Sequence, residues 1–269
     1  MTIDAWLRNV SSEFADAMIP SARLDAEIIL AHTINRPRTW LHAHGSEALD
    51  PRRRDIADAR AELRLERVPI AYIIGHKYFY GRRFIVTPDV LIPRPESEAL
   101  IELLADQQPA QAARLVDVGT GSGCLGITAK LEHPELDVTL LDTSKAALAV
   151  AQKNCDALGA TTINLMKSNL LQSYPYRADV IIANLPYVGR DWNVSSDTVH
   201  EPEQALYADD DGLAVIKKLL ASAASSLQAN GVCIIEADER QHTAIIEYAM
   251  SSHLHHERTH GLGLLFRAS

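Results

Sequence analysis

Four consecutive residues, Asn184, Leu185, Pro186 and Tyr187, offer groups that could act on a planar nitrogen. An amide or exocyclic amine nitrogen is a poor nucleophile because its lone pair is delocalised. The Asn184 side-chain carbonyl and the Leu185 backbone carbonyl could accept its two N–H bonds and so raise the electron density on nitrogen. Pro186 fixes a backbone φ angle, and the ring of Tyr187 could hold the planar group in line. Positioning and electrostatics could then supply most of the catalysis without a strong general base.

A glycine-rich loop follows an earlier apolar run. Gly119, Gly121 and Gly123 permit a tight turn and let a ligand approach the backbone N–H groups that open a helix. Gly121, Gly123 and Gly126 also satisfy the dinucleotide pattern G-x-G-x-x-G, and Asp142 lies about 20 residues further on, where it could accept from ribose hydroxyls. The loop and Asp142 therefore predict a cofactor that contains adenosine. They leave NAD and S-adenosylmethionine both open.

The elements that must position these residues alternate between strand and helix from about Arg114 onward. The expected strands are LVDVG, DVTLLD, INLMK, ADVIIAN and GVCIIEA. This alternation predicts an α/β fold with a parallel, doubly wound sheet. Two further strands joined by a turn around Gly261 predict a closing antiparallel hairpin, which fits a methyltransferase sheet better than a dehydrogenase sheet. Asn184 follows the fourth strand, at the edge where open α/β sheets bind ligands. The sheet and the Asn184 motif together favour S-adenosylmethionine.

The rest of the chain predicts two additional parts. Residues 1–70 show only helical spacing of apolar residues and predict a small all-α N-terminal domain, with Ser21 as a candidate N-cap. Residues 71–94 predict a β-hairpin linker. We expect residues 95–269 to form the methyltransferase domain, which starts with a helix.

Composition limits the class of protein. The 269 residues are 47% hydrophobic and carry a net charge of −9, which weighs against non-specific nucleic-acid binding. No apolar run approaches the roughly 20 residues of a membrane span, and the first residues lack a signal or transit pattern. Cys124, Cys155 and Cys233 are far apart, which predicts a reducing compartment. We therefore expect a soluble cytoplasmic protein without a membrane partner.

Three other features favour structural interpretations or leave two readings open. The basic stretch 52–83 predicts a solvated helix face with pairs such as Arg54–Asp58, with a partner-docking patch as the alternative. The histidines near the C-terminus lack cysteine or carboxylate at ligand spacing, so no metal site is expected. Glu201 could line a substrate groove or stabilise a loop.

Several motifs resemble the HemK/PrmC family of peptide chain release factor N5-glutamine methyltransferases. They are ARLDAEIILAH (22–32), ERVPIAYIIGHKYFYGRRFIVTPDVLIPRPESEALIELL (66–104), DVGTGSGCLGI (117–127), NLPYV (184–188) and HEPEQALYADDDGL (200–213). The linker together with NLPY and EPxxAL is the most specific part. The resemblance implies a class I, Rossmann-like methyltransferase. It implies methyl transfer from S-adenosyl-L-methionine to the side-chain amide nitrogen (N5) of the glutamine in a release factor's Gly-Gly-Gln motif.

The resemblance also implies roles for individual residues. Asn184 and the Leu185 carbonyl accept from the glutamine amide, with Pro186 and Tyr187 beside it. The segment 92–98 caps the cofactor, and the helical domain docks the release factor. Leu185 replaces a proline of the family, but only its backbone carbonyl is required. The cofactor-binding residues implied are Gly119, Thr120, Gly121, Ser122, Gly123, Asp142, Asn169 (commonly aspartate in the family), Leu170 and Asn184.

Other functions remain as alternatives. The same groups suit an adenine amine in nucleic acid, or another translation protein. An NAD-dependent oxidoreductase would leave NLPY unexplained, and a non-catalytic scaffold would leave the whole set of contact groups unused. The main hypothesis is a monomer that methylates a release factor and has no direct nucleic-acid partner.

Overall fold

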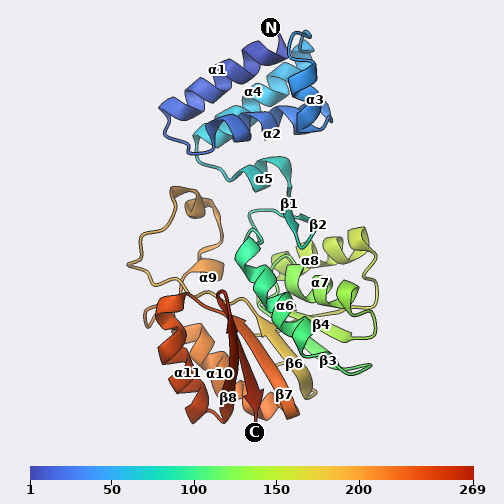
Figure 1. The fold of residues 1–269 in the computed structure, drawn as a ribbon, viewed down its shortest axis with the longest axis vertical. Helices are drawn as coiled ribbons and strands as arrows, with labels where there is room; N and C mark the ends of the chain where they lie inside the picture. Colours follow the sequence, from blue (N-terminus) through green and yellow to red (C-terminus); the bar gives the residue numbers. More distant parts are fainter. The chain divides into compact units, whose positions relative to one another are not determined.

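The computed structural model describes residues 1–269, apart from the side chain of Ser196 (Figure 1). The chain divides into two compact units. The helical unit contains Met1–Gly75 and Ser195–His200, and the larger unit contains His76–Val194 and Glu201–Ser269. Among the described residues, no helix combines the length and the apolarity that a membrane crossing requires.

The helical unit packs its helices around one apolar core that includes Trp6, Phe14 and Leu30. Ser21 stands at the N-cap of the second helix, as predicted, but its side chain makes no capping hydrogen bond. Its φ of −97° and ψ of 27° differ from the extended backbone that turns a capping oxygen toward the first N–H groups. The helices are α1 (Ile3–Asp16), α2 (Ala22–Ile34), α3 (Arg38–Ala43), α4 (Pro51–Leu65) and α5 (Ile70–Ile74).

The basic residues of α4 and the turn after it stabilise the helical unit from within. Arg53 donates to the Ile34 carbonyl at 2.9 Å, and Arg67 donates to the Ala17 carbonyl at 2.5 Å. Both carbonyls lie at helix C-termini, where backbone acceptors lack partners. Arg54 pairs with Asp58 at 3.8 Å, as predicted.

The larger unit is built on a seven-stranded sheet with the order β5-β4-β3-β6-β7-β9-β8. Its first five strands pair in parallel, whereas β9 is antiparallel to both β7 and β8. This confirms the predicted doubly wound sheet and its closing hairpin. The strands are β3 (Arg114–Val118), β4 (Asp137–Asp142), β5 (Asn164–Lys167), β6 (Ala178–Ala183), β7 (Leu227–Glu236), β8 (Leu254–His260) and β9 (Gly263–Ala268).

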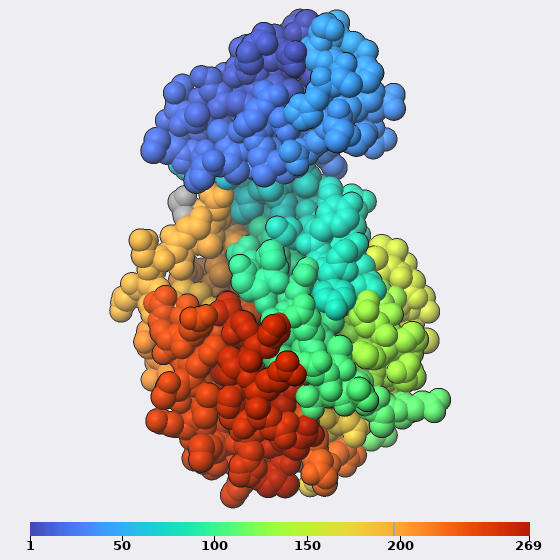
Figure 2. Space-filling model, in the orientation of Figure 1, coloured from blue at the N-terminus to red at the C-terminus, as the bar shows by residue number. Residues whose placement is uncertain are grey.

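Helices cover both faces of this sheet (Figure 1). Alternate strand residues face opposite sides, so Leu115 packs in one apolar cluster with α6–α8 and Val116 packs in the other with α10 and α11. Figure 2 shows α6 (green) at the surface beside the C-terminal strands (red), and Glu102 of α6 accepts from His260 of β8 at 2.6 Å. The helices are α6 (Glu98–Asp106), α7 (Cys124–Glu132), α8 (Lys145–Leu158), α9 (Glu203–Leu206), α10 (Ala214–Ser226) and α11 (His242–Ser251).

The predicted hairpin linker is also present. β1 (His76–Phe79) pairs antiparallel with β2 (Arg82–Ile85). The connecting residues Tyr80 and Gly81 have φ angles of 48° and 72°, as two-residue hairpin turns require.

Candidate active site

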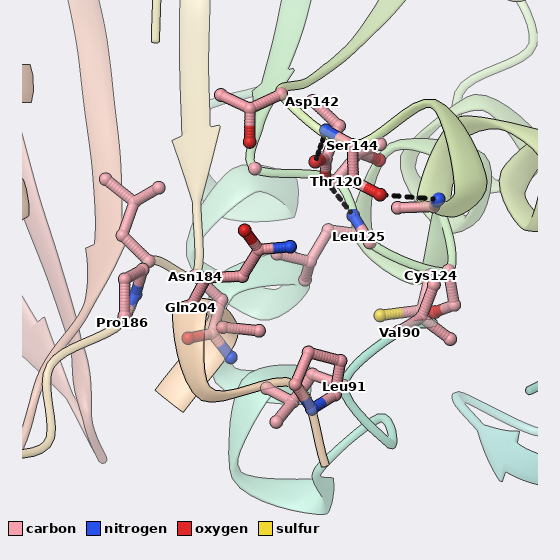
Figure 3. Close-up of a pocket in the computed structure, with 18 of the residues that line it drawn as sticks. Val90, Leu91, Thr120, Cys124, Leu125, Asp142, Ser144, Asn184, Pro186 and Gln204 are labelled. Carbon is pink, nitrogen blue, oxygen red and sulfur yellow. Dashed lines mark hydrogen bonds between the residues drawn. The ribbon is translucent and has the colours of Figure 1, made fainter. Parts of the chain in front are cut away.

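The carboxyl ends of three neighbouring strands, β3, β4 and β6, surround a cavity of about 1070 Å³ including its open mouth. Figure 3 shows Asn184 reaching from the end of β6 toward the middle of the hollow, with Thr120 and Asp142 on one side. Most residues singled out from the sequence line this cavity: Gly119, Thr120, Gly121, Ser122, Asp142, Asn169, Leu170, Asn184, Leu185 and Pro186. Gly123 and Tyr187 are not among the lining residues. From the segment 92–98, the lining residues are Pro93, Arg94 and Ser97.

The glycine loop turns sharply because the backbone at three of its glycines, Gly119, Gly121 and Gly123, is left-handed. Gly119 has a φ of 72°, and a Cβ atom there would stand 2.8 Å from Cδ2 of Leu185. Gly123, with a φ of 83°, is the N-cap of α7. Gly123 therefore ends the loop and begins α7. At Gly119, the missing side chain allows Leu185 to pack directly against the loop.

Asp117, at the base of the loop, is buried and holds the turn together. One carboxylate oxygen accepts from the Thr120 hydroxyl at 2.6 Å and from the Gly126 N–H at 2.9 Å. Burial raises the pKa of Asp117 to about 6, although the bonds from Thr120 and Gly126 oppose the rise and the charge of Asp142 adds to it.

Asp142 is fixed by two backbone donors. Its oxygens accept from the N–H groups of Gly121 and Ser144 at 2.9 Å and 2.8 Å. A carboxylate oxygen has capacity for a second hydrogen bond. Asp142 is therefore oriented at the cavity wall with acceptor capacity left for a pair of hydroxyl groups.

Asn154 of α8 joins the hairpin to the glycine loop. Its Oδ1 accepts from the Ile85 N–H at 2.7 Å, and its Nδ2 donates to the Ile85 and Ser122 carbonyls at 3.0 Å and 2.8 Å. The side chain is fully buried. A single side-chain amide thus satisfies three backbone groups and stabilises the glycine loop.

The Asn184 side chain is oriented by a serine far away in the sequence. Its Nδ2 donates to Oγ of Ser97 at 2.9 Å, and Ser97 is 2% exposed. Because the amide N–H₂ group is directed at Ser97, the carbonyl oxygen of Asn184 is left for another donor. A substrate N–H group requires such a free acceptor.

Hydrogen bonds fix both the side chain and the backbone of Tyr187. Its hydroxyl donates to Oε1 of Glu236 at 2.9 Å, and its backbone carbonyl accepts from Nε2 of Gln241 at 2.9 Å. Gln241 also donates to the Asp211 carbonyl at 2.8 Å. Burial raises the pKa of the Tyr187 hydroxyl, and the charge and hydrogen bond of Glu236 raise it further.

Glu201 stabilises a loop. It is buried, and its oxygens accept from the Ile92 N–H at 3.1 Å and from Arg94 at 2.5 Å. It is not among the lining residues, whereas Arg94 is. Glu201 therefore acts on the cavity through the segment it supports.

Sequence reasoning missed Asn154, Glu236 and Gln241, and it placed Ser97 in the capping segment 92–98 without its contact to Asn184. Asn154 carried a usable signal, because it shares the apolar face of α8 with Ala147, Val150 and Ala151. A polar residue on such a face needs a buried partner. Glu236 gave a weaker signal as the acidic end of an apolar strand.

Comparison with known proteins agrees with this architecture. Residues 5–75 match the family model of the PrmC N-terminal domain, and residues 95–261 match that of the methyltransferase small domain. A release factor glutamine methyltransferase from Bordetella pertussis is 36% identical over 227 residues, which cover 82% of this chain and 83% of the relative. One from Koribacter versatilis is 35% identical over 245 residues, which cover 88% of this chain and 86% of the relative.

Solved structures show the same fold. A methyltransferase from Pyrococcus furiosus aligns with a TM-score of 0.54 at 18% identity, over 78% of this chain and 96% of that chain. The fold and the site together define a class I, S-adenosylmethionine-dependent methyltransferase. Within that class, the chain belongs to the release factor glutamine methyltransferase family.

Proposed function

We propose that this enzyme transfers a methyl group from S-adenosyl-L-methionine to the side-chain amide nitrogen of the Gly-Gly-Gln glutamine in a peptide chain release factor. The observation that carries the proposal is the orientation of Asn184. Its amide N–H₂ group is bound by Ser97, so its carbonyl oxygen is the atom left for a substrate donor. The names of the relatives from Bordetella pertussis and Koribacter versatilis support glutamine as the substrate.

The cavity fits S-adenosylmethionine. Asp142, held by Gly121 and Ser144, has acceptor capacity for both ribose hydroxyls. Leu125 and Leu170 add apolar wall. We assign Gly119, Thr120, Gly121, Ser122, Asn169 and Leu170 to cofactor contact because they line the cavity. When bound, the cofactor supplies an electrophilic methyl group on a sulfonium.

The end of β6 would then prepare the glutamine nitrogen. The Asn184 Oδ1 and the Leu185 carbonyl accept the two N–H bonds of the amide, which orients nitrogen toward the cofactor and raises its electron density. Pro186 lines the cavity beside them. Tyr187 lies outside the lining, so we assign it a supporting role in which its ring, fixed by Glu236, stiffens the motif.

A transfer assay tests the proposal. The enzyme is mixed with purified release factor and S-adenosylmethionine labelled in the methyl group. We expect label on the factor, and no label when the Gly-Gly-Gln glutamine is replaced by alanine. Label that persists after that replacement contradicts the proposal, and labelling of an oligonucleotide instead would favour the adenine alternative.

We further propose that the helical unit helps to dock the release factor. Every residue that lines the cavity belongs to the larger unit, which leaves the helical unit for another task. Ile56 and Leu63 are seven residues apart on one side of α4, and each is 43% exposed. Exposed apolar side chains beside basic ones, such as Arg52, suit a protein partner.

Docking is tested by comparing two substrates. Ile56→Glu and Leu63→Glu should raise KM for the intact factor and leave KM for a short Gly-Gly-Gln peptide unchanged. Equal effects on both substrates would exclude this role.

We also propose a cytoplasmic monomer without a nucleic-acid partner. All three cysteines are unpaired, as is usual in a reducing compartment.

A further inference from the structure

Glu236 lies at the end of β7, behind the Asn184–Tyr187 motif, and is 1% exposed. Its Oε1 accepts from the Tyr187 hydroxyl at 2.9 Å. Its Oε2 is buried and has no hydrogen bond of ordinary geometry within the described part of the chain. A buried carboxylate with unused acceptor capacity is costly, so its place beside the motif calls for an explanation.

Ser97 connects Glu236 to Asn184. The Ser97 Oγ accepts from Asn184, and a hydroxyl in that position still has one hydrogen to donate. The side chains of Ser97 and Asn184 both lie near enough to Glu236 to stabilise its charged form. An ionised carboxylate can only accept, so a Ser97 hydroxyl that turns its hydrogen toward Glu236 keeps its lone pairs for the Asn184 N–H₂ group.

We propose that Glu236 is a positioning residue whose carboxylate sets the hydrogen-bond polarity of both Asn184 and Tyr187. This inference rests on the proposed function. Through Ser97, Glu236 directs the Asn184 carbonyl oxygen toward the substrate amide. Through the phenol, it fixes the plane of the Tyr187 ring. One buried acceptor thereby converts a flexible amide, which could present either its oxygen or its nitrogen, into an acceptor for the substrate.

Glu236→Gln reverses this polarity at almost constant shape. The new amide nitrogen would donate to Ser97, whose hydrogen would then bond the Asn184 oxygen and turn the Asn184 N–H₂ group toward the substrate. We expect kcat to fall about 100-fold, the size of effect that misplaced catalytic groups produce. The Kd for S-adenosylmethionine should stay unchanged, because Glu236 is not among the residues that line the cavity.

A set of variants separates this role from a general effect on folding. Glu27→Gln removes a carboxylate that is 5% exposed in the helical unit and should leave kcat unchanged with a peptide substrate. Ser97→Ala and Tyr187→Phe should each lower kcat. In the double variant Ser97→Ala/Tyr187→Phe, adding Glu236→Gln should cost much less than it does in the wild type, because only the direct interaction of Glu236 with Asn184 is left. Fully additive losses, or a loss confined to the cofactor Kd, would overturn the inference.

A second measurement does not depend on the substrate. In ¹⁵N-labelled protein, the Asn184 side-chain amide protons, identified from their loss in Asn184→Asp, should exchange slowly in the wild type and faster in both Ser97→Ala and Glu236→Gln. Identical exchange in wild type and Glu236→Gln overturns the relay even if the enzyme methylates glutamine. A wild type that does not methylate release factor glutamine contradicts the proposed function instead, and the exchange result then still decides the relay.

Discussion

The orientation of one amide decides whether the end of β6 offers a substrate an acceptor or a donor. Asn184 and Ser97 are 87 residues apart in the sequence, yet their 2.9 Å contact selects the acceptor. The chemical nature of Asn184 could be predicted from its motif. Its orientation could not, because it depends on Ser97 and Glu236, which reach the motif only through the folded sheet.

The charge of Glu236 predicts an acid limb in the pH profile. Burial raises the pKa of Glu236, and Glu96 raises it further, while Ser97, Tyr187 and Asn184 lower it. The charge of Glu236 in turn raises the pKa of the Cys124 thiol. Because a protonated Glu236 donates, kcat should be full above the raised pKa and fall as pH falls through it. Measuring kcat from about pH 5 to 8 at saturating cofactor checks this. The limb should vanish in Glu236→Gln, and its survival there would assign it to another group.

Asp117 predicts a pH dependence of stability. Its pKa is raised from 3.8 to about 6 in the folded protein, so the folded state holds the proton more tightly than the unfolded state. Its contribution is therefore most favourable below 3.8 and is lost as pH rises through about 6. Relative to Asp117→Asn, the free energy of unfolding of the wild type should drop by roughly 3 kcal/mol between the two limits. Urea titrations at several pH values measure this difference; a constant difference would show that Asp117 is not shifted.

At the scale of elements, α8 supports the glycine loop through Asn154. Asn154→Ala leaves the Ile85 and Ser122 backbone groups without their partner. We expect a loss of about 2–4 kcal/mol in the free energy of unfolding, with weaker S-adenosylmethionine binding. The control is Gln152→Ala on the exposed side of the same helix, where only a bond to Asp156 is lost. Equal losses in both variants would contradict the supporting role of Asn154.

The elements themselves were largely predictable from the sequence. The strands from β3 to β9 and the β1–β2 hairpin follow from apolar runs bounded by glycine and polar residues. The position of the Ser21 cap could be predicted, but its missing side-chain bond could not, because residue type does not determine the backbone angles that such a bond needs. Glu236 and Tyr187 are joined across 49 residues, and Asn154 and Ile85 across 69. Such pairs depend on strand order, which a single sequence indicates only in outline.

At the scale of the whole molecule, each unit has its own stabilising interactions. In the helical unit, Arg64 is 4% exposed and donates to Asp25, and it also pairs with Asp197, each at 2.8 Å. The segment Ser195–His200, which the chain reaches only after most of the larger unit, is thereby fixed in the helical unit. The His200 ring, which contacts the Glu66 carbonyl at 3.0 Å, adds a second attachment.

Arg64→Leu should therefore destabilise the helical unit strongly. It leaves the buried Asp25 without its cation, and breaking such a pair costs about 3–5 kcal/mol. Circular dichroism during urea unfolding should show an early loss of helix in the variant. The combined variant Arg64→Leu/Asp25→Leu should recover much of the loss, since neither member of the buried Arg64–Asp25 pair then carries a charge. Failure to recover would mean that Arg64 stabilises the unit by packing alone.

The most direct test of the central claim is to locate the transferred methyl group by tandem mass spectrometry of release factor treated with the wild type and with Asn184→Ala. We predict one methyl group on the side-chain nitrogen of the Gly-Gly-Gln glutamine with the wild type. With Asn184→Ala, we predict at least a 100-fold slower appearance of the same product, the order expected when a group that stabilises the transition state is removed. A methyl group on another residue, or an unchanged rate with Asn184→Ala, would contradict the assignment.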